Sequence, residues 1–592
     1  MSTDTGTTVG VGLAEPLLGD VSVTPAEAIV RAAVDAGIEV AIGIPGGNTQ
    51  GIFDALYDHQ DKIRTVLVRE ESLAAIMAEI HGTLKGKPAL VVAQGAWVVA
   101  NCAMGMLDAF TGSSPMVVLC DMTDGGYLSH HAVYQSATGE YGNWDVKRSL
   151  DGYTKLTTVA YDPVQAVQHV QQAVKHSVAG QAGPVAVVLH SAALTGEVGP
   201  DSTPRLYRST QYLGRDARPA EPAAIDAAAA ALVGAKSPII VAGNGVRIGA
   251  AFAELRGLAE ALRIPVVTTN GGKGVFPEDH ELALGLIGSF GLEAANGELA
   301  AADVVLVVGS RLGAVDTCGE NPDLLDPSRQ EIHQIDIEQR NARWVMPTAG
   351  ALVGDAATTL AALTERAVER GGRADDDIRA RLAAARERGD FEAEASFSDV
   401  APVKPQRLVR DLWRSLPSDA VVLCDAGENR LYMAHHYRAR AANGFIQPAG
   451  IGGMGFAIPA ALGAKLAEPE RVAVAVCGDG GFAMTCNGLM TAVEEQLPIV
   501  VVVMNNRMLG WVRHCQGDRP IASELGNFDH AAIGRAMGAQ GFTVTAPGEL
   551  AEAIVTAAAT VDRPTVIDVS IDPTESFLST QSNYGGTWTA LV

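Results

Sequence analysis

The chain has 592 residues, of which 47% are hydrophobic and 19% charged, and its formal net charge is −24 at pH 7. A chain of this length is too long for one hydrophobic core and is expected to form three domains of ordinary size. The acidic balance argues against nucleic acid as a partner, because such partners need basic surfaces. No apolar run reaches about 18 residues, so no membrane-spanning segment is expected.

The N-terminal residues and the cysteines indicate a cytoplasmic protein. No basic segment followed by an apolar core opens the chain, so no signal peptide is expected. The seven cysteines form no Cys-x-x-Cys pair, which argues against a zinc site or a disulfide framework. Most of them lie in apolar runs and are expected to be reduced core residues. Residues 1–22 are expected to form a loose arm, followed by a helix that begins with a capping box formed by Thr24 and Glu27 and has Pro25 at its first position.

Composition places two breaks between domains. Pro, Gly, Ser and Arg cluster without periodicity over 197–219, and an irregular stretch over 397–405 follows a charged helix expected over 375–394. The expected units are a first domain over 23–195, a central domain over 220–375, a third domain over 400–575 and a tail over 576–592. The tail is polar and rich in glycine, so it could close over a site as a lid or be a frayed end.

Several segments of the expected first domain place polar or glycine residues after apolar runs. Residues 44–48 read Ile-Pro-Gly-Gly-Asn, and two adjacent glutamates, Glu70 and Glu71, follow another apolar run. A glutamate at such a place is also the usual start of a solvated helix. Farther on, His130 and His131 form a pair. Histidine titrates near neutral pH and serves as an acid or a base, but two loop histidines with local hydrogen bonds are the alternative.

The central domain is expected to open with a strand and a glycine turn over 238–246. Further strands are expected to end near Asn270, Arg311 and Asp336. An isolated glycine turn after a strand is weak support for a bound nucleotide, so the turn alone does not predict one.

The third domain carries the most informative segment. A buried-strand run over 472–477 ends in Gly478-Asp479-Gly480-Gly481, and a second run ends in Asn505-Asn506. The stretch between them, 482–496, has helical spacing, so a β-α-β unit is expected. Parallel sheets bind ligands beyond the carboxyl ends of their strands, so Asp479 and Asn506 are expected to point into one crevice.

The residue types in this crevice suit a metal-bound diphosphate. A carboxylate and an amide oxygen are ligands that Mg²⁺ accepts while it keeps water and phosphate oxygens as its other ligands. The glycines let the backbone approach a diphosphate, and the N-terminus of the following helix adds N–H groups. An ordinary glycine turn in an α/β crossover is the alternative, which the combined spacing disfavours.

This segment resembles the thiamine-diphosphate motif, and residues 23–571 resemble the superfamily of acetohydroxyacid (acetolactate) synthase, pyruvate oxidase and pyruvate decarboxylase. The resemblance implies an α/β fold with three doubly wound parallel-sheet domains, namely a pyrimidine-binding, a central Rossmann-like and a diphosphate-binding domain. It also implies that Asp479, Asn506 and the main-chain carbonyl of Met508 hold Mg²⁺. The implied cofactor contacts are Pro45, Gly46, Gly427, Glu428, Asn429, Gly452, Met454, Gly478, Asp479, Gly480, Gly481, Asn506, Met508, Leu509 and Gly510. Met454 takes the place of the residue that props the cofactor in its bent form, although a buried Met is more often plain core.

The resemblance also implies which residues act in catalysis. Glu71 takes the place of the glutamate that activates the cofactor, and Glu70 replaces the usual histidine beside it. Glu71 and Asp479 lie in the first and third domains, which meet across a subunit interface in the superfamily. A homodimer or homotetramer is therefore implied. In the superfamily the central domain holds FAD, ADP or nothing, which makes Arg311 and Asp336 candidate contacts for phosphate and for ribose or adenine.

The chain departs from the synthase pattern beside the reacting carbon. The synthases carry Ser-Gly-Pro-Gly there, but residues 93–101 have lost the Gly-Pro-Gly, and Trp97 enlarges the wall. Gln94 places a polar amide near the cofactor, and the substrate need not be pyruvate. The pair His130-His131 resembles that of pyruvate decarboxylases, whereas Gln135, after a tyrosine, resembles the aromatic-glutamine step of the synthases.

These observations favour a thiamine-diphosphate-dependent carboligase or lyase of the acetolactate synthase type, acting on a small-molecule carbonyl substrate. A non-oxidative 2-oxoacid decarboxylase is the alternative that His130 and His131 favour, and a 2-hydroxyacyl-CoA lyase is a third. A cofactor-free relative is disfavoured because Glu71, Asp479 and Asn506 are all present. A nucleotide-binding dehydrogenase is disfavoured because no Gly-x-Gly-x-x-Gly opens a helix.

Overall fold

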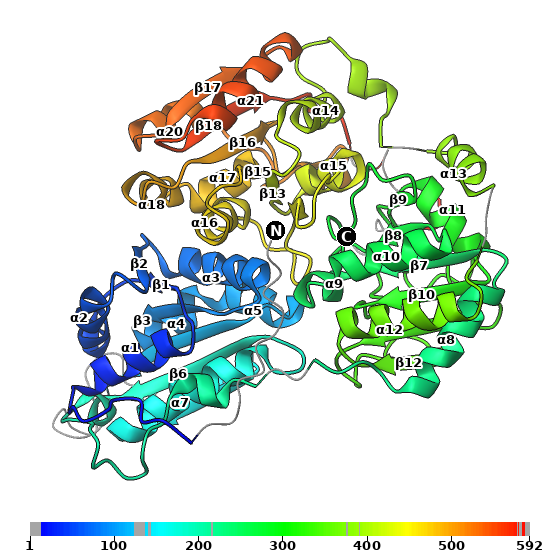
Figure 1. Ribbon diagram of the computed structural model, residues 1–592. Helices are drawn as coiled ribbons and strands as arrows, with labels where there is room; N and C mark the ends of the chain where they lie inside the picture. The colour runs from blue at the N-terminus through cyan, green and yellow to red at the C-terminus, as the bar shows by residue number, and fades with distance from the viewer. Residues whose placement is uncertain are drawn as a thin grey trace.

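The computed structural model describes residues 13–123, 137–139, 144–214, 217–373, 377–389, 391–576, 578 and 583–585. Three parallel six-stranded sheets, each packed against helices, follow one another along the chain (Figure 1). The predicted α/β fold class is thereby confirmed. In Figure 1 the first unit is blue to cyan, the central unit green and the third yellow to red.

The first sheet has the strand order β2-β1-β3-β4-β6-β5. Its strands are β1 (Val40–Gly43), β2 (Arg64–Leu67), β3 (Ala89–Ala93), β4 (Met116–Met122), β5 (Leu156–Ala160) and β6 (Pro184–His190). The helices of this unit are α1 (Pro25–Asp35), α2 (Gln50–Asp58), α3 (Glu71–Lys85), α4 (Gly95–Asn101), α5 (Ala103–Gly112), α6 (Val146–Leu150) and α7 (Pro163–Val178). Short 3₁₀ turns are η1 (Gly47–Thr49), η4 (Ser191–Leu194) and η5 (Ser209–Tyr212).

The central sheet has the order β12-β11-β10-β7-β8-β9, that of a Rossmann-like domain. Its strands are β7 (Pro238–Ala242), β8 (Val266–Thr268), β9 (Ala283–Leu286), β10 (Val304–Val308), β11 (Glu331–Asp336) and β12 (Gly350–Val353). The helices are α8 (Pro222–Gly234), α9 (Asn244–Ile248), α10 (Phe252–Leu262), α11 (Glu293–Ala301), α12 (Ala356–Glu369) and α13 (Ile378–Arg386).

The third sheet has the order β14-β13-β15-β16-β18-β17. Its strands are β13 (Val421–Cys424), β14 (Phe445–Ile446), β15 (Ala473–Gly478), β16 (Ile499–Asn505), β17 (Gln540–Val544) and β18 (Thr565–Ser570). The helices are α14 (Pro405–Ser415), α15 (Glu428–His436), α16 (Ala457–Ala467), α17 (Asp479–Thr485), α18 (Gly488–Glu494), α19 (Gly510–Cys515), α20 (His530–Ala536) and α21 (Leu550–Ala559), with 3₁₀ turns η6 (Glu394–Phe397) and η7 (Pro547–Glu549). When the strands of each unit are numbered in chain order, the first and third sheets have the same strand order. The sequence alone does not show this shared topology.

Local sequence explains where these elements begin and break. Thr24 caps α1, because its hydroxyl accepts the backbone N–H of Glu27 at 3.2 Å, and Pro25 opens the helix as predicted. The carboxylate of Glu27 pairs with Arg31 and His59 and is not used in a capping box. The single helix expected over 482–496 is two short helices, α17 and α18, separated at residues 486–487.

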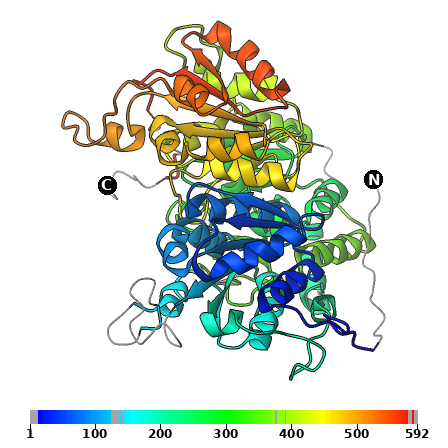
Figure 2. The same ribbon diagram turned by 90° about the vertical axis from the view of Figure 1, so that its left-hand side faces the viewer.

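The third unit lies against the first, as Figures 1 and 2 show. One hydrophobic core continues through both units and includes residues of α3 and α16. A Cβ on Gly463 would lie 2.4 Å from the carbonyl oxygen of Met77, so the two helices pack with almost no space between their backbones. The side chain of Arg64 bonds to Glu495 at the edge of this contact.

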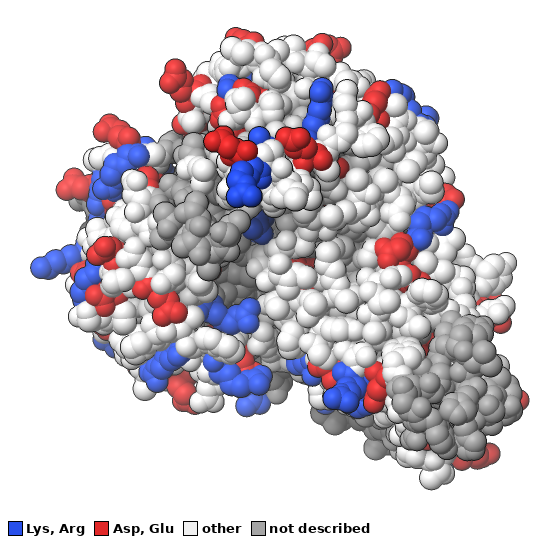
Figure 3. Space-filling view, turned by 180° about the vertical axis from the view of Figure 1, so that it is seen from behind, with Lys and Arg blue, Asp and Glu red and all other residues white. Residues whose placement is uncertain are grey.

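The central unit is attached by a buried arginine. Arg247 of α9 donates all five guanidinium N–H groups: to Asn244, Gly271 and Lys273 of the central unit, and to Asn443 and Phe445 of the third. On the face shown in Figure 3, acidic and basic side chains are scattered around a broad uncharged area. Within the described ranges, no helix is long and apolar enough to cross a membrane.

Candidate active site

A cavity of about 100 Å³ lies at the carboxyl edge of the third sheet. The end of β15 contributes Gly478 and Asp479, and Asn506 follows β16, so the predicted crevice exists. The other lining residues are Pro405, Ala426, Gly427, Glu428, Asn429, Tyr432, Met454, Gly480, Gly481, Met504, Met508, Leu509, Gly510, Trp511, Val512, Ile571, Asp572 and Glu575.

Asp479 is a buried acid with one carboxylate oxygen that has no hydrogen-bond partner among the described residues. Its side chain is buried, and Oδ1 accepts the N–H of Gly480 at 2.9 Å. Oδ2 is also buried but has no hydrogen-bond partner within the described part of the chain. Burial raises the pKa of Asp479 to about 6. A buried carboxylate oxygen without a partner is costly unless a cation or a donor occupies the cavity.

Asn506 lines the same cavity. Its Oδ1 accepts the N–H of Met508 at 3.2 Å, which closes a tight turn after β16. Leu509 continues this turn and donates its N–H to the carbonyl of Ser523. Asp479, Asn506 and Met508 therefore line one cavity, and a carboxylate, an amide oxygen and a backbone carbonyl are oxygen donors of the kind that Mg²⁺ accepts.

Three glycines keep the cavity open. A Cβ on Gly480 would lie 2.8 Å from Leu509, and a Cβ on Gly481 would lie 1.8 Å from Asp425 Oδ2. Gly427 has a φ of 112°, which a residue with a side chain rarely adopts. The backbone can therefore approach a bound diphosphate closely at these positions.

Asp425 holds the loop that carries Met454. Its carboxylate accepts the N–H of Gly455 at 3.0 Å and of Phe456 at 2.8 Å, and burial raises its pKa to about 6. Gly452 and Gly455 both have positive φ, at 70° and 81°. This bracing places Met454 in the wall of the cavity, with its methyl group 3.2 Å from where a Cβ of Gly480 would lie.

A second polar group gathers at the carboxyl edge of the first sheet. Glu71 opens α3 with its side chain buried, and its Oε2 accepts Nδ2 of Asn101 at 2.8 Å. The neighbouring Glu70 is half-buried, accepts a hydrogen bond from Ser72, and has a pKa raised by burial. The two adjacent glutamates therefore have different surroundings, and only Glu71 is buried.

Gln94 lies beside Gly46 in the first unit. A Cβ on Gly46 would lie 2.7 Å from Nε2 of Gln94, so a side chain at this position would displace the Gln94 amide. Oε1 of Gln94 accepts the indole N–H of Trp97 at 2.9 Å, and 50% of Trp97 is exposed. The three remaining catalytic candidates, His130, His131 and Gln135, lie outside the described residues.

Among the described residues, none from the first unit lines the 100 Å³ cavity. Every lining residue of this cavity lies between 405 and 575. The lining of this cavity thus includes every predicted third-domain residue except Gly452, whereas Glu71, bonded to Asn101, and Gln94, next to Gly46, belong to the first unit.

Several residues at these sites were not anticipated from the sequence. Asn101 contacts Glu71, and Asp121 accepts the N–H groups of Asn48 and Gly95 at 2.9 and 3.0 Å. Asp121 and Asp425 each end an apolar run with the letters Val-Val-Leu-Cys-Asp, a signal that marks an acid at a strand end. His514 contacts Glu428 with no comparable signal, because the two residues lie 86 positions apart.

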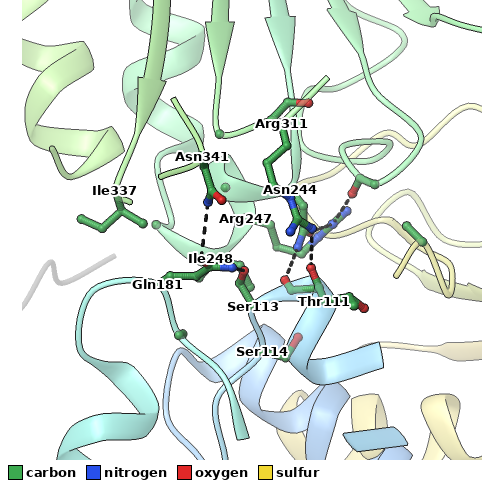
Figure 4. Close-up of a pocket in the computed structure, with 18 of the residues that line it drawn as sticks. Thr111, Ser113, Ser114, Gln181, Asn244, Arg247, Ile248, Arg311, Ile337 and Asn341 are labelled. Atoms are coloured by element: carbon green, nitrogen blue, oxygen red, sulfur yellow. Dashed lines mark hydrogen bonds between the residues drawn. The ribbon is translucent and has the colours of Figure 1, made fainter. Parts of the chain in front are cut away.

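A larger cavity of about 640 Å³ lies between the first and central units (Figure 4). Thr111 and Gln181 line one side, and Arg311 and Asn341 line the other. Arg311 donates to the carbonyl of Thr111 at 2.8 Å, and Asn341 donates to Gln181 at 3.4 Å. Asp336 also lines this cavity, at the end of β11.

Asp336 accepts the N–H of Glu338 and the amide of Asn341, and burial raises its pKa. The cavity therefore holds a cationic Arg311 and an acidic Asp336 at the carboxyl edge of a Rossmann-like sheet, where ligands bind in such folds. Both residues named from the sequence line this one cavity.

Comparison with known proteins identifies the class. Residues 23–140 match the model of the N-terminal TPP-binding domain of thiamine pyrophosphate enzymes, residues 225–363 match their central domain, and residues 425–569 match their C-terminal TPP-binding domain. Thiamine pyrophosphate is another name for thiamine diphosphate.

Similar proteins of known name cover almost the whole chain. A probable acetolactate synthase large subunit of Methanocaldococcus jannaschii is 30% identical over 93% of this chain and 92% of its own length. The acetolactate synthase isozyme 3 large subunit of Escherichia coli is 30% identical over 95% and 97%. A sulfoacetaldehyde acetyltransferase of Alcaligenes xylosoxydans is 28% identical over 88% of each chain. The chain belongs to the thiamine pyrophosphate enzyme family.

Proposed function

We propose that the chain is an acetolactate-synthase-like carboligase or lyase that acts on a small carbonyl substrate with Mg²⁺ and thiamine diphosphate. The observation that carries the proposal is the cavity lined by Asp479 and Asn506, because Oδ2 of Asp479 is buried without a hydrogen-bond partner in the described part of the chain. The similarity to acetolactate synthase large subunits supports the carboligase reading. Because another relative is named as a sulfoacetaldehyde acetyltransferase, the proposal specifies neither the donor nor the acceptor substrate.

The residues of the cavity fit the cofactor's diphosphate and metal. Asp479, Asn506 and the carbonyl of Met508 would hold Mg²⁺, which prefers oxygen ligands in an octahedron completed by water and phosphate. The backbone at Gly480 and Gly481, which line the cavity, would contact the diphosphate. Met454 would support the cofactor from the side.

Bound thiamine diphosphate supplies a nucleophilic carbon that adds to the carbonyl carbon of the substrate, and it stabilises the negative charge left on the substrate when a bond to that carbonyl carbon breaks. The chain would orient the cofactor and hold or move a proton at its pyrimidine ring. Glu71 would hold a proton against the pyrimidine ring, and the amide of Asn101, bonded to Oε2, would fix the angle of that carboxyl group. Gln94, bonded to Trp97, would present its amide beside the pyrimidine.

We further propose that the working form is at least a homodimer. Glu71 belongs to the first unit, whereas the lining of the diphosphate cavity comes entirely from the third unit of the same chain. A second copy can supply the missing carboxyl group, so each site would join Asp479 to Glu71 of the partner subunit. The half-exposed Trp97 would be covered by the same contact.

A nucleotide in the 640 Å³ cavity is a secondary proposal. Arg311 would contact a phosphate, and Asp336 would accept a hydrogen bond from a ribose hydroxyl or an adenine amine. FAD and ADP are the candidates, and denaturing the purified protein and analysing the released small molecules distinguishes them from an empty cavity.

The test of function uses wild-type protein with thiamine diphosphate, Mg²⁺ and a panel of 2-oxoacids, with and without aldehyde acceptors. Carbon dioxide, aldehyde and acyloin are measured together. Acyloin formation with carbon dioxide supports the carboligase. Carbon dioxide with aldehyde alone supports the decarboxylase instead. Cofactor binding without turnover of any 2-oxoacid would contradict both and would favour cleavage of acyloins, diketones or 2-hydroxyacyl-CoA esters.

A further inference from the structure

The described walls of the diphosphate cavity carry acidic side chains and no basic ones. Four acidic residues line it, and no Lys, Arg or His is among the described lining residues. The acidic residues are Glu428, Asp479, Asp572 and Glu575. A diphosphate is itself an anion, so a cavity of this kind would repel it unless cations nearby compensate the carboxylates.

Two of these carboxylates share a lysine. Nζ of Lys404 lies 2.8 Å from Asp572 Oδ2 and 2.6 Å from Glu575 Oε1. Asp479 is the proposed metal ligand, so Mg²⁺ would compensate its charge. Glu428 is the carboxylate that remains, and it is the first residue of α15 with only 6% of its side chain exposed.

Glu428 lies directly against the turn that follows the proposed metal ligands. A Cβ on Gly510 would lie 2.1 Å from Glu428 Oε2 and 3.0 Å from Asn506 Nδ2. The carboxylate therefore borders the part of the cavity where the metal and the diphosphate would meet. An uncompensated charge at this place would weaken binding of the anionic cofactor.

His514 of α19 contacts Glu428 from behind the cavity wall. Its Nδ1 lies 2.6 Å from Glu428 Oε1, and its Nε2 lies 3.0 Å from the carbonyl oxygen of Pro573. A carbonyl oxygen can only accept, so Nε2 must carry a hydrogen. The contact with Glu428 then needs one more proton, on the ring or on the carboxyl group. In either arrangement the pair as a whole is neutral.

We propose, on the basis of the proposed cofactor site, that His514 is a positioning residue for the diphosphate: it neutralises Glu428 and so makes this acidic wall compatible with an anionic cofactor. Through Pro573 the same ring also holds the segment after β18, which carries the lining residues Asp572 and Glu575. The raised pKa of His514, caused mainly by its hydrogen bond to Glu428, agrees with this geometry.

The test measures binding of thiamine diphosphate in saturating Mg²⁺ by isothermal titration calorimetry, with quenching of Trp511, which lines the cavity, as a second readout. The variants are H514Q, E428Q and E428Q/H514Q. Removing one member of a close charge pair exposes the other, so H514Q is expected to weaken binding by about tenfold or more. The double variant is expected to bind more tightly than H514Q and about as tightly as E428Q, because the carboxylate of Glu428 is absent from both of these variants.

A matched control is H280Q, because His280 also pairs with a carboxylate, Glu260, at 3.1 Å, but in the central unit. Its affinity for the cofactor is expected to equal that of wild type. Wild-type affinity in H514Q, or a double variant no better than H514Q, would overturn the inference while leaving the cofactor site intact. If H514Q does not fold, a comparison of E428Q with E428Q/H514Q decides: equal affinities support the inference and a tenfold gap overturns it. No binding to wild type would overturn the cofactor site itself.

Discussion

Nδ2 of Asn101, the last residue of α4, lies 2.8 Å from Oε2 of Glu71, the first residue of α3. The bond joins two helix ends at the carboxyl edge of the first sheet and fixes the direction of a buried carboxyl group. Such a group can hold a proton at one defined place, which is what activation of a bound cofactor requires.

Loss of the Asn101 amide is expected to slow turnover without preventing cofactor binding. A hydrogen bond to a charged group contributes about 1.5–3 kcal/mol, so N101A is expected to lower kcat by about tenfold or more. The thiamine diphosphate affinity, measured by calorimetry, is expected to stay within about threefold of wild type. An unchanged kcat in N101A would show that Glu71 needs no such orientation.

Glu71 and its neighbour Glu70 form a natural pair of test and control. E71Q is expected to lower turnover by about 10²–10⁴-fold, because the amide cannot exchange a proton with the pyrimidine. E70Q changes a half-buried residue that bonds to Ser72 and is expected to keep activity within about tenfold of wild type. Steady-state kinetics with saturating cofactor distinguishes the two. A larger loss in E70Q than in E71Q would reverse the assignment.

Gly481 is expected to tolerate no side chain. An added Cβ would lie 1.8 Å from Asp425 Oδ2, so G481A must displace the carboxylate that holds the Met454 loop. We expect G481A to destabilise the third unit by about 1–3 kcal/mol, measured by urea unfolding. G548A is the control, because nothing lies within 4 Å of its added Cβ. Equal stability of the two variants would contradict the packing described here.

His81 in α3 is expected to make the protein less stable in mild acid. Burial, with a smaller contribution from Lys85, lowers the pKa of this ring from its usual value to about 4. The unfolded chain therefore binds the proton more readily than the folded chain, so the stability is present above about pH 6.5 and is lost as pH falls toward 4. Between pH 7 and pH 5 the loss is about 2 kcal/mol.

Comparison with H81L isolates this contribution, because leucine does not titrate. Thermal unfolding at pH 7 and pH 5 is expected to show a larger drop for wild type than for H81L. Parallel drops in the two proteins would mean that His81 is protonated in the fold.

The sheets and the diphosphate cavity could be predicted because their signals are local. Apolar runs such as 472–477 end directly in glycine and acid, and parallel strands bring such ends to one edge. The crevice at Asp479 follows from this pattern, whereas the three parallel-sheet domains were implied by the resemblance, and six strands in each sheet were not predicted. The break between α17 and α18 was missed, since helical spacing over 482–496 persists across it.

The contacts that hold the site residues in place could not be predicted, because they join residues far apart in the chain. Glu428 and His514 are 86 positions apart, and Asn101 and Glu71 are 30 apart. In each pair, the type of one residue does not indicate which distant residue it contacts. The shared strand order of the first and third sheets was hidden for the same reason, since topology depends on pairing and not on local pattern.

The central claim is that Asp479 and Asn506 anchor thiamine diphosphate through a divalent metal. Its most direct test is calorimetric titration of metal-free protein with thiamine diphosphate, with Mg²⁺ or with EDTA, for wild type, D479N and the exposed control D562N. The account predicts saturable binding with Mg²⁺ to wild type and D562N, and a loss of about 100-fold in EDTA or in D479N. Binding of equal strength in EDTA, or to D479N, would contradict it.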